Sequence, residues 1–134
     1  MSARPLDLVV DAMNVIGARP TGWWRDRDGA VRALVDRLRA LAAADAHGIT
    51  VIVDGRPISG LPEGDHEGVE VLYAARSGRN AADDRIVEFL RAQSDPRAFE
   101  VITSDRDLTG RATALGAGVH GALSLLERLD RFDA

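Results

Sequence analysis

Four aspartates in this sequence have the residue type and the spacing to hold a divalent metal ion. Three of them end apolar, strand-like runs: Asp11 in LVVDA, Asp54 in VIVDG and Asp105 in VITSD. The fourth, Asp83, falls at the centre of the apolar stripe of a predicted helix, so it should point inward at the first turn. Carboxylates gathered at one place repel one another unless a cation lies between them. An all-oxygen set suits Mg²⁺ or Mn²⁺, and such ions assist hydrolysis of phosphodiesters.

Two further polar side chains accompany these acids. Asn14 follows the first aspartate by three residues and would add amide contacts without adding charge, and Asp107 lies two residues beyond the last aspartate. Each acid alone has a simpler explanation, because Asp commonly caps helices and turns. Ser104 and Asp107 have the spacing of a capping box, so for Asp107 capping is the favoured explanation. Four acids brought to one edge of a sheet are harder to explain by capping.

Alternating strands and helices are predicted to position these residues. The predicted strands cover 6–11, 49–55, 69–75, 99–104 and 118–120, and the predicted helices cover 29–46, 81–94, 106–115 and 121–131. Segment 59–68 is rich in Gly, Pro and acids and is expected to be a loop. This order predicts one α/β domain over residues 1–134, with helices on both faces of a mostly parallel five-stranded sheet. In such a sheet the carboxyl ends of the strands share one edge, where ligands bind.

Composition excludes several classes of chemistry. The chain has 134 residues, of which 46% are hydrophobic, enough to form a core. There is no lysine among its 17 basic residues, which excludes a Schiff base, a Walker lysine and the lysine of a receiver domain. There is no cysteine, which excludes disulfides and thiolate metal sites. Neither a signal peptide nor a membrane-spanning run is visible, so a cytoplasmic location is expected.

Basic and aromatic residues near the same edge could bind nucleic acid. The net charge is −4, so an RNA partner would need a local basic patch or bound metal ions. The segment RPTGWWRDRDG follows the first strand, and its tryptophans could stack on bases while its arginines contact phosphates. Anchoring of the loop on the domain or on a partner subunit is slightly favoured for the tryptophans. The candidate nucleic-acid-binding residues are Arg19, Trp23, Trp24, Arg25, Arg76 and Arg79, with Arg85 as a further rim residue.

Four motifs in order, VVDAMNVIG, VIVDG, NAADDRIVEFL and VITSDRDL, resemble the PIN-like nuclease superfamily, most closely its NYN branch with the small bacterial YacP-like proteins. The resemblance implies a Rossmann-like three-layer sandwich with strand order 3-2-1-4-5 and an RNase site that uses Mg²⁺ or Mn²⁺. It implies that the core metal ligands are Asp11, Asp83 and Asp105, that Asn14 orients substrate, water or a carboxylate, and that Asp54 and Asp107 are outer acids. The family often has Gly after the first Asp, where this chain has Ala12. Such relatives often dimerise, and a homodimer stays open here.

The leading hypothesis is a metal-dependent ribonuclease that hydrolyses RNA phosphodiester bonds with a metal-activated water, with endo- and exonuclease action both open. One alternative is a non-catalytic RNA-binding or ribosome-associated NYN module, which would bind RNA in the presence of EDTA. Another is a nucleoside triphosphate pyrophosphohydrolase, which would release pyrophosphate without any RNA. Covalent catalysis has no support, because no serine, cysteine or histidine forms a nucleophilic constellation.

Overall fold

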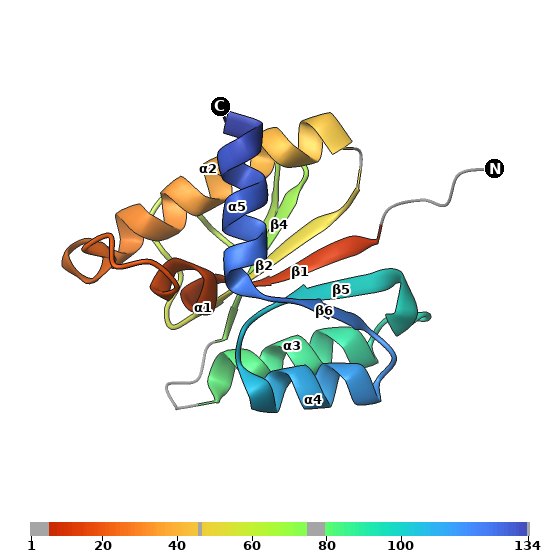
Figure 1. Ribbon diagram of the computed structural model, residues 1–134. Helices are drawn as coiled ribbons and strands as arrows, with labels where there is room; N and C mark the ends of the chain where they lie inside the picture. Colours follow the sequence, from red (N-terminus) through yellow and green to blue (C-terminus); the bar gives the residue numbers. More distant parts are fainter. Residues whose placement is uncertain (1–5, 46, 75–79, 134) are drawn as a thin grey trace.

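A six-stranded sheet with helices on both faces forms the centre of the molecule (Figure 1). The structure is a computed structural model that describes residues 6–45, 47–74 and 80–133. The strands are β1 (Asp7–Asp11), β2 (Ile49–Asp54), β3 (Gly64–His66), β4 (Val69–Ala74), β5 (Phe99–Ile102) and β6 (Gly118–His120). Their order is β3-β4-β2-β1-β5-β6, and every pair except β3 with β4 is parallel. The five predicted strands therefore have the expected order, and the expected α/β class is confirmed.

The sixth strand corrects the predicted count of five and lies inside the segment expected to be a loop. β3 pairs antiparallel with β4 through a two-residue turn, in which Glu67 and Gly68 both have positive φ, 54° and 94°. Hairpins favour this turn geometry because it matches the twist of the strands. The strand escaped prediction because its three residues, Gly-Asp-His, carry no alternating apolar pattern.

Five helices cover the two faces of the sheet in the described part of the chain. They are α1 (Ala12–Gly17), α2 (Arg27–Asp45), α3 (Ala81–Arg91), α4 (Arg106–Ala114) and α5 (Ala122–Asp133), with 3₁₀ turns η1 (Trp23–Arg25) and η2 (Pro96–Ala98). Helices α1, α2 and α5 lie on one face, and α3 and α4 lie on the other (Figure 1). The four predicted helices are present, with ends shifted by up to three residues. Helix α1 was not predicted, because six residues are too few to show an apolar stripe.

The central strand β1 packs against both layers. Leu8 and Val10 belong to the core under α1, α2 and α5, whereas Val9 belongs to the core under α3 and α4. Burial on both faces explains why this strand is a continuous apolar run that ends abruptly at Asp11. Within the described residues, no helix combines the length and the apolar character needed to cross a bilayer.

Candidate active site

Asp11 and Thr103 lie side by side at the carboxyl edge of the sheet. Asp11 ends β1 and is 5% exposed, and Thr103 follows β5 and is 1% exposed. The hydroxyl Oγ1 of Thr103 donates a hydrogen bond of 2.9 Å to Oδ2 of Asp11. The same oxygen accepts a hydrogen bond of 3.1 Å from the backbone N–H of Asp105. Thr103 thus joins the carboxylate of the first strand to the segment that carries the third acid.

Sequence reasoning missed Thr103, although a signal for it exists. In the parallel register of β1 with β5, Val10 pairs with Ile102, so the next residues along the two strands are Asp11 and Thr103. Aligning the ends of VVDA and VITSD would have placed a hydroxyl beside the carboxylate. The bond itself joins side chains that are 92 residues apart in the sequence.

Asp83 points inward from the first turn of α3, as its place in the apolar stripe predicted. It is 8% exposed and shares its face of the helix with the buried residues Ile86 and Val87. Its neighbour Asp84 is exposed and forms an ion pair of 2.9 Å with Arg111 of α4. The periodicity of the helix therefore separated a buried acid from a surface acid that is adjacent in the sequence.

Burial and mutual repulsion perturb the titration of two of these acids. Burial raises the pKa of Asp11 from 3.8 to about 6; the Thr103 hydrogen bond opposes this rise, and the charges of Asp83 and Asp105 add to it. Burial also raises the pKa of Asp83 to about 6, with a further contribution from Asp105 and an opposing one from Arg111. Aspartates from β1, α3 and the end of β5 are therefore close enough to repel one another.

Asp105 is the N-cap of α4. Its Oδ1 accepts a hydrogen bond of 2.9 Å from the backbone N–H of Leu108. The expected pairing of Ser104 with Asp107 as a capping box is therefore wrong, because the helix begins one residue later than that spacing requires. Ser104 instead accepts a hydrogen bond of 2.9 Å from the N–H of Ala122, the first residue of α5. Asp107 lies exposed in the first turn of α4 and adds to the raised pKa of Asp83.

Asn14 and Asp54 also lie at this edge but make different contacts. The Oδ1 atom of Asn14, on α1, accepts a hydrogen bond of 2.8 Å from the backbone N–H of Ser104, which holds the segment after β5 against α1. Asp54 lies two residues beyond the position of β2 that pairs with Asp11, and its backbone carbonyl accepts a hydrogen bond from Arg27. Asp83 and Asp105, and not Asp54, are the acids that raise the pKa of Asp11. Asp54 therefore lies at the periphery of the group.

The donor chemistry of the group fits a hard divalent cation. All the candidate ligands are carboxylates, and a cation between them would relieve the repulsion that raises their pKa values. Among the residues that the structure describes, no three carboxylate or imidazole groups already converge closely enough to enclose an ion. A cation bound here would require the side chains to turn toward it. Thr103 occupies Oδ2 of Asp11, the N–H of Leu108 occupies Oδ1 of Asp105, and the backbone of Asn14 also hydrogen-bonds the Asp11 carboxylate.

Comparison with known proteins assigns the family. The sequence matches the model of the YacP-like NYN domain over residues 8–134. The chain belongs to this family. The structure is similar to the crystal structure of Rae1 (YacP) from Bacillus subtilis, with a TM-score of 0.68 and 22% sequence identity, covering 94% of this chain and 74% of that chain. A point mutant of Rae1 gives a TM-score of 0.72 and 22% identity, covering 95% and 76%. A search of curated proteins gives no significant match.

The two tryptophans of this NYN domain have unequal environments. Trp23 is half-buried and lies over Gly17 at the end of α1, whereas Trp24 is 58% exposed. Their rings meet edge to face at 6.0 Å. The favoured interpretation, in which the tryptophans anchor the loop, fits Trp23 but not Trp24, whose side chain is mostly exposed.

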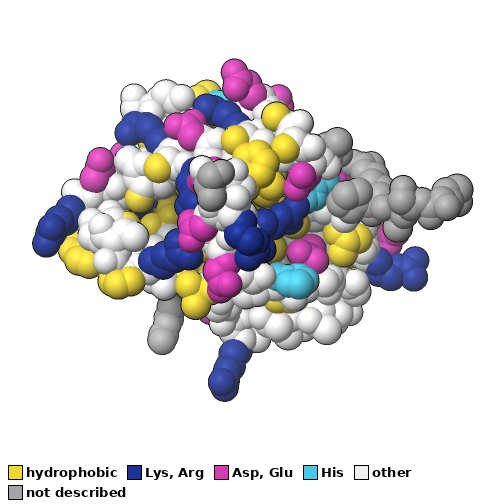
Figure 2. Space-filling model, turned by 45° about the horizontal axis from the view of Figure 1, so that its top comes forward, with side chains coloured by type: hydrophobic (Ala, Val, Ile, Leu, Met, Phe, Trp, Pro, Cys, Tyr) yellow, Lys and Arg dark blue, Asp and Glu magenta, His cyan; other side chains and the backbone are white. Residues whose placement is uncertain are grey.

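The candidate arginines also differ in their contacts and exposure. Arg19 forms an ion pair of 2.8 Å with Asp130 of α5, and Arg37 of α2 pairs with the same acid at 2.9 Å. Arg25 is exposed, and Arg76 and Arg79 lie outside the described residues. On the face shown in Figure 2, the described basic and acidic side chains are interspersed and form no continuous basic patch.

Proposed function

We propose that this NYN domain is a metal-dependent ribonuclease that hydrolyses RNA phosphodiester bonds at a site formed by Asp11, Asp83 and Asp105. The observation that carries the proposal is the burial of the first two carboxylates beside the third at one edge of the sheet. Keeping repelling carboxylates out of water lowers stability, and strongly perturbed acids gather at functional sites. The family assignment supports a nuclease-type role related to RNA.

The aspartates and their neighbours would have distinct roles at this site. A bound Mg²⁺ or Mn²⁺ supplies Lewis-acid stabilisation of the phosphate and activation of water. The three aspartates would hold the ion through their oxygens, and Thr103 would keep the Asp11 carboxylate in one orientation through its 2.9 Å hydrogen bond. Asn14 would keep the backbone at Ser104, and with it the next residue, against α1.

Two outer acids and two helix ends would complete the site. Asp54 and Asp107 are proposed as supporting acids that increase the attraction for cations without lying at the centre. The first turns of α3 and α4 carry Asp83 and Asp107, so both helices begin at the site. Backbone N–H groups at helix N-termini favour bound phosphate, which would offset part of the repulsion between the acids and RNA.

The test is cleavage of end-labelled RNA in Mn²⁺ by the wild type and by Asp11→Asn and Asp83→Asn. Asp36→Asn is the matched control, because Asp36 lies exposed on α2 and pairs only with Arg39 in the contacts described. We expect the site variants to lose more activity than the roughly 10- to 100-fold that outer-shell substitutions cost, and the control to cleave like the wild type. Equal cleavage by the wild type and Asp83→Asn would refute the proposal.

The same preparation separates the alternative functions. RNA binding that persists in EDTA without any cleavage would favour a non-catalytic module. Release of pyrophosphate from nucleoside triphosphates without RNA would favour a pyrophosphohydrolase. In either case the Asp11→Asn variant shows whether the carboxylates take part.

A further inference from the structure

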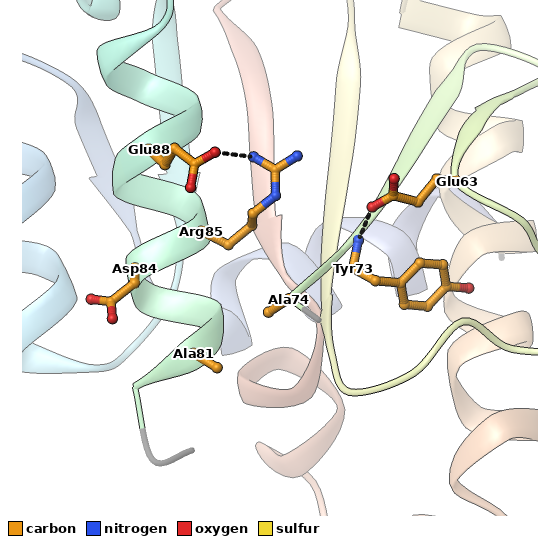
Figure 3. Close-up of a pocket in the computed structure, with 7 residues that line it drawn as sticks. All are labelled: Glu63, Tyr73, Ala74, Ala81, Asp84, Arg85 and Glu88. Atoms are coloured by element: carbon orange, nitrogen blue, oxygen red, sulfur yellow. Dashed lines mark hydrogen bonds and ion pairs between the residues drawn. The ribbon is translucent and has the colours of Figure 1, made fainter. Parts of the chain in front are cut away.

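A groove of about 450 Å³ lies next to the candidate active site, between β4 and the first turns of α3 (Figure 3). Tyr73 and Ala74 of β4 and Ala81 of α3 line it. Arg85 reaches into the groove from α3 and Glu63 reaches toward it from the opposite wall, as Figure 3 shows. The volume lies in the range of about 300–1,000 Å³ that is typical of small-ligand sites.

The groove opens at the same edge of the sheet as the carboxylates. Asp83 points to the active site, and the next residue of α3, Asp84, lines the groove. On the other wall, Ala74 is the strand partner of Asp54. A polynucleotide with a phosphate at the active site can therefore place an adjacent base in the groove.

The polar groups of the groove are held in place by the protein. Oε1 of Glu63 accepts a hydrogen bond of 2.9 Å from the backbone N–H of Tyr73. The side chain of Tyr73 points away from the groove into the core on the opposite face of the sheet, where its hydroxyl donates to the carbonyl of Leu61 at 2.5 Å and accepts from the N–H of Ile58 at 3.2 Å. It fixes β4 but is not one of the polar groups of the groove. The guanidinium of Arg85 lies 3.6 Å from the carboxylate of Glu88. The groove thus presents an acceptor on one wall and a guanidinium plane on the other.

The charge of the groove selects the kind of group that can enter. Two carboxylates, on Glu63 and Glu88, accompany one lining guanidinium, on Arg85, whereas the carboxylate of Asp84 points away from the groove and is paired with Arg111 of α4. The balance is negative, which disfavours a phosphate and favours a neutral group with hydrogen-bond donors. Guanidinium planes stack on unpaired bases, and carboxylates accept hydrogen bonds from base N–H groups.

We propose that this groove binds an unpaired guanine of the RNA beside the cleaved bond, with Glu63 accepting from N1–H and the N2 amino group and Arg85 stacking on the ring. Guanine has two adjacent donors on its Watson–Crick edge. Uracil has one donor between two carbonyl oxygens that a carboxylate repels, and adenine and cytosine place an acceptor next to their amino group. RNA as the natural ligand rests on the proposed function, whereas recognition of guanine rests on the groove.

The test begins with binding of the four nucleoside monophosphates in EDTA, followed through the amide NMR signals of Ala74 and Ala81. We expect GMP to bind the wild type at least about 10-fold more tightly than UMP, the range for a bidentate base contact. Glu63→Gln keeps an acceptor for the N–H of Tyr73 and should lose this preference. Arg85→Ala should weaken all four nucleotides. Glu127→Gln, exposed on α5, is the control and should bind as the wild type does.

Mapping of cut sites in a random-sequence RNA completes the test. The wild type should show guanine enriched at one position beside the cut, and Glu63→Gln should lose the enrichment while it continues to cleave. Cleavage by the wild type without any base preference, or equal binding of GMP and UMP, would overturn the guanine site and leave the nuclease proposal intact. Preferential GMP binding by a protein that cleaves no RNA would support the groove and refute the nuclease.

Discussion

Substitution of Asp11 by Asn should stabilise the protein at neutral pH. The side chain is 5% exposed and its pKa is raised from 3.8 to about 6. The folded state therefore binds the proton more tightly than the unfolded state, so the wild type loses stability as the pH rises from about 4 to about 6. A shift of about 2 units corresponds to about 3 kcal/mol at pH 7. Asparagine does not ionise and keeps an oxygen for the hydrogen bond from Thr103, so the variant avoids this loss.

The assay is urea unfolding followed by far-ultraviolet circular dichroism in EDTA at several pH values from 4 to 8. Asp11→Asn should equal the wild type near pH 4 and exceed it in free energy of unfolding by up to about 3 kcal/mol at pH 7. The control Asp36→Asn, exposed on α2, should show no such trend. A variant that is less stable than the wild type at pH 7, or a difference that does not change with pH, would refute the burial argument.

The metal site, the Thr103 hydrogen bond and the two tryptophans can each be tested separately. Millimolar Mn²⁺ should raise the melting temperature of the wild type by mass action and have little effect on Asp83→Asn, as measured by scanning fluorimetry. Thr103→Val removes the donor to Asp11 and should cost about 1–3 kcal/mol in urea unfolding at pH 7, whereas Thr103→Ser should restore most of it. Trp24→Ala should change stability by less than about 0.5 kcal/mol but weaken RNA binding in fluorescence anisotropy, whereas Trp23→Ala should destabilise by more than about 1 kcal/mol. Equal effects of the two tryptophan substitutions would contradict the last of these.

The longer strands and helices could be predicted from the sequence, because each has an apolar pattern that is visible in its own residues. Apolar runs marked the main strands, and their alternation with helices indicated a parallel sheet. The inward direction of Asp83 followed from the helical period alone, because Ile86 and Val87 define its face. These signals are local, and each depends on residues within a few turns or strand positions.

The parts that depend on register between distant segments could not be predicted. Thr103 and Asp11 come together only because β1 and β5 pair with one particular alignment. The hydrogen bond from the backbone N–H of Ser104 to Asn14 likewise depends on α1, a helix too short to show an apolar stripe in the sequence. β3 was not predicted because its three residues show no alternation of apolar and polar side chains. The ion pair of Arg19 with Asp130 could not be predicted because it joins segments that are far apart in the chain.

The most direct measurement of the central claim is an anomalous diffraction map from crystals soaked in Mn²⁺. We expect a peak in contact with carboxylate oxygens of Asp11, Asp83 and Asp105, with the side chains turned toward it and the hydrogen bond from Thr103 retained. The peak should be absent in crystals of Asp83→Asn. Manganese bound elsewhere, with these three carboxylates unchanged, would contradict the assignment of this edge as a metal site.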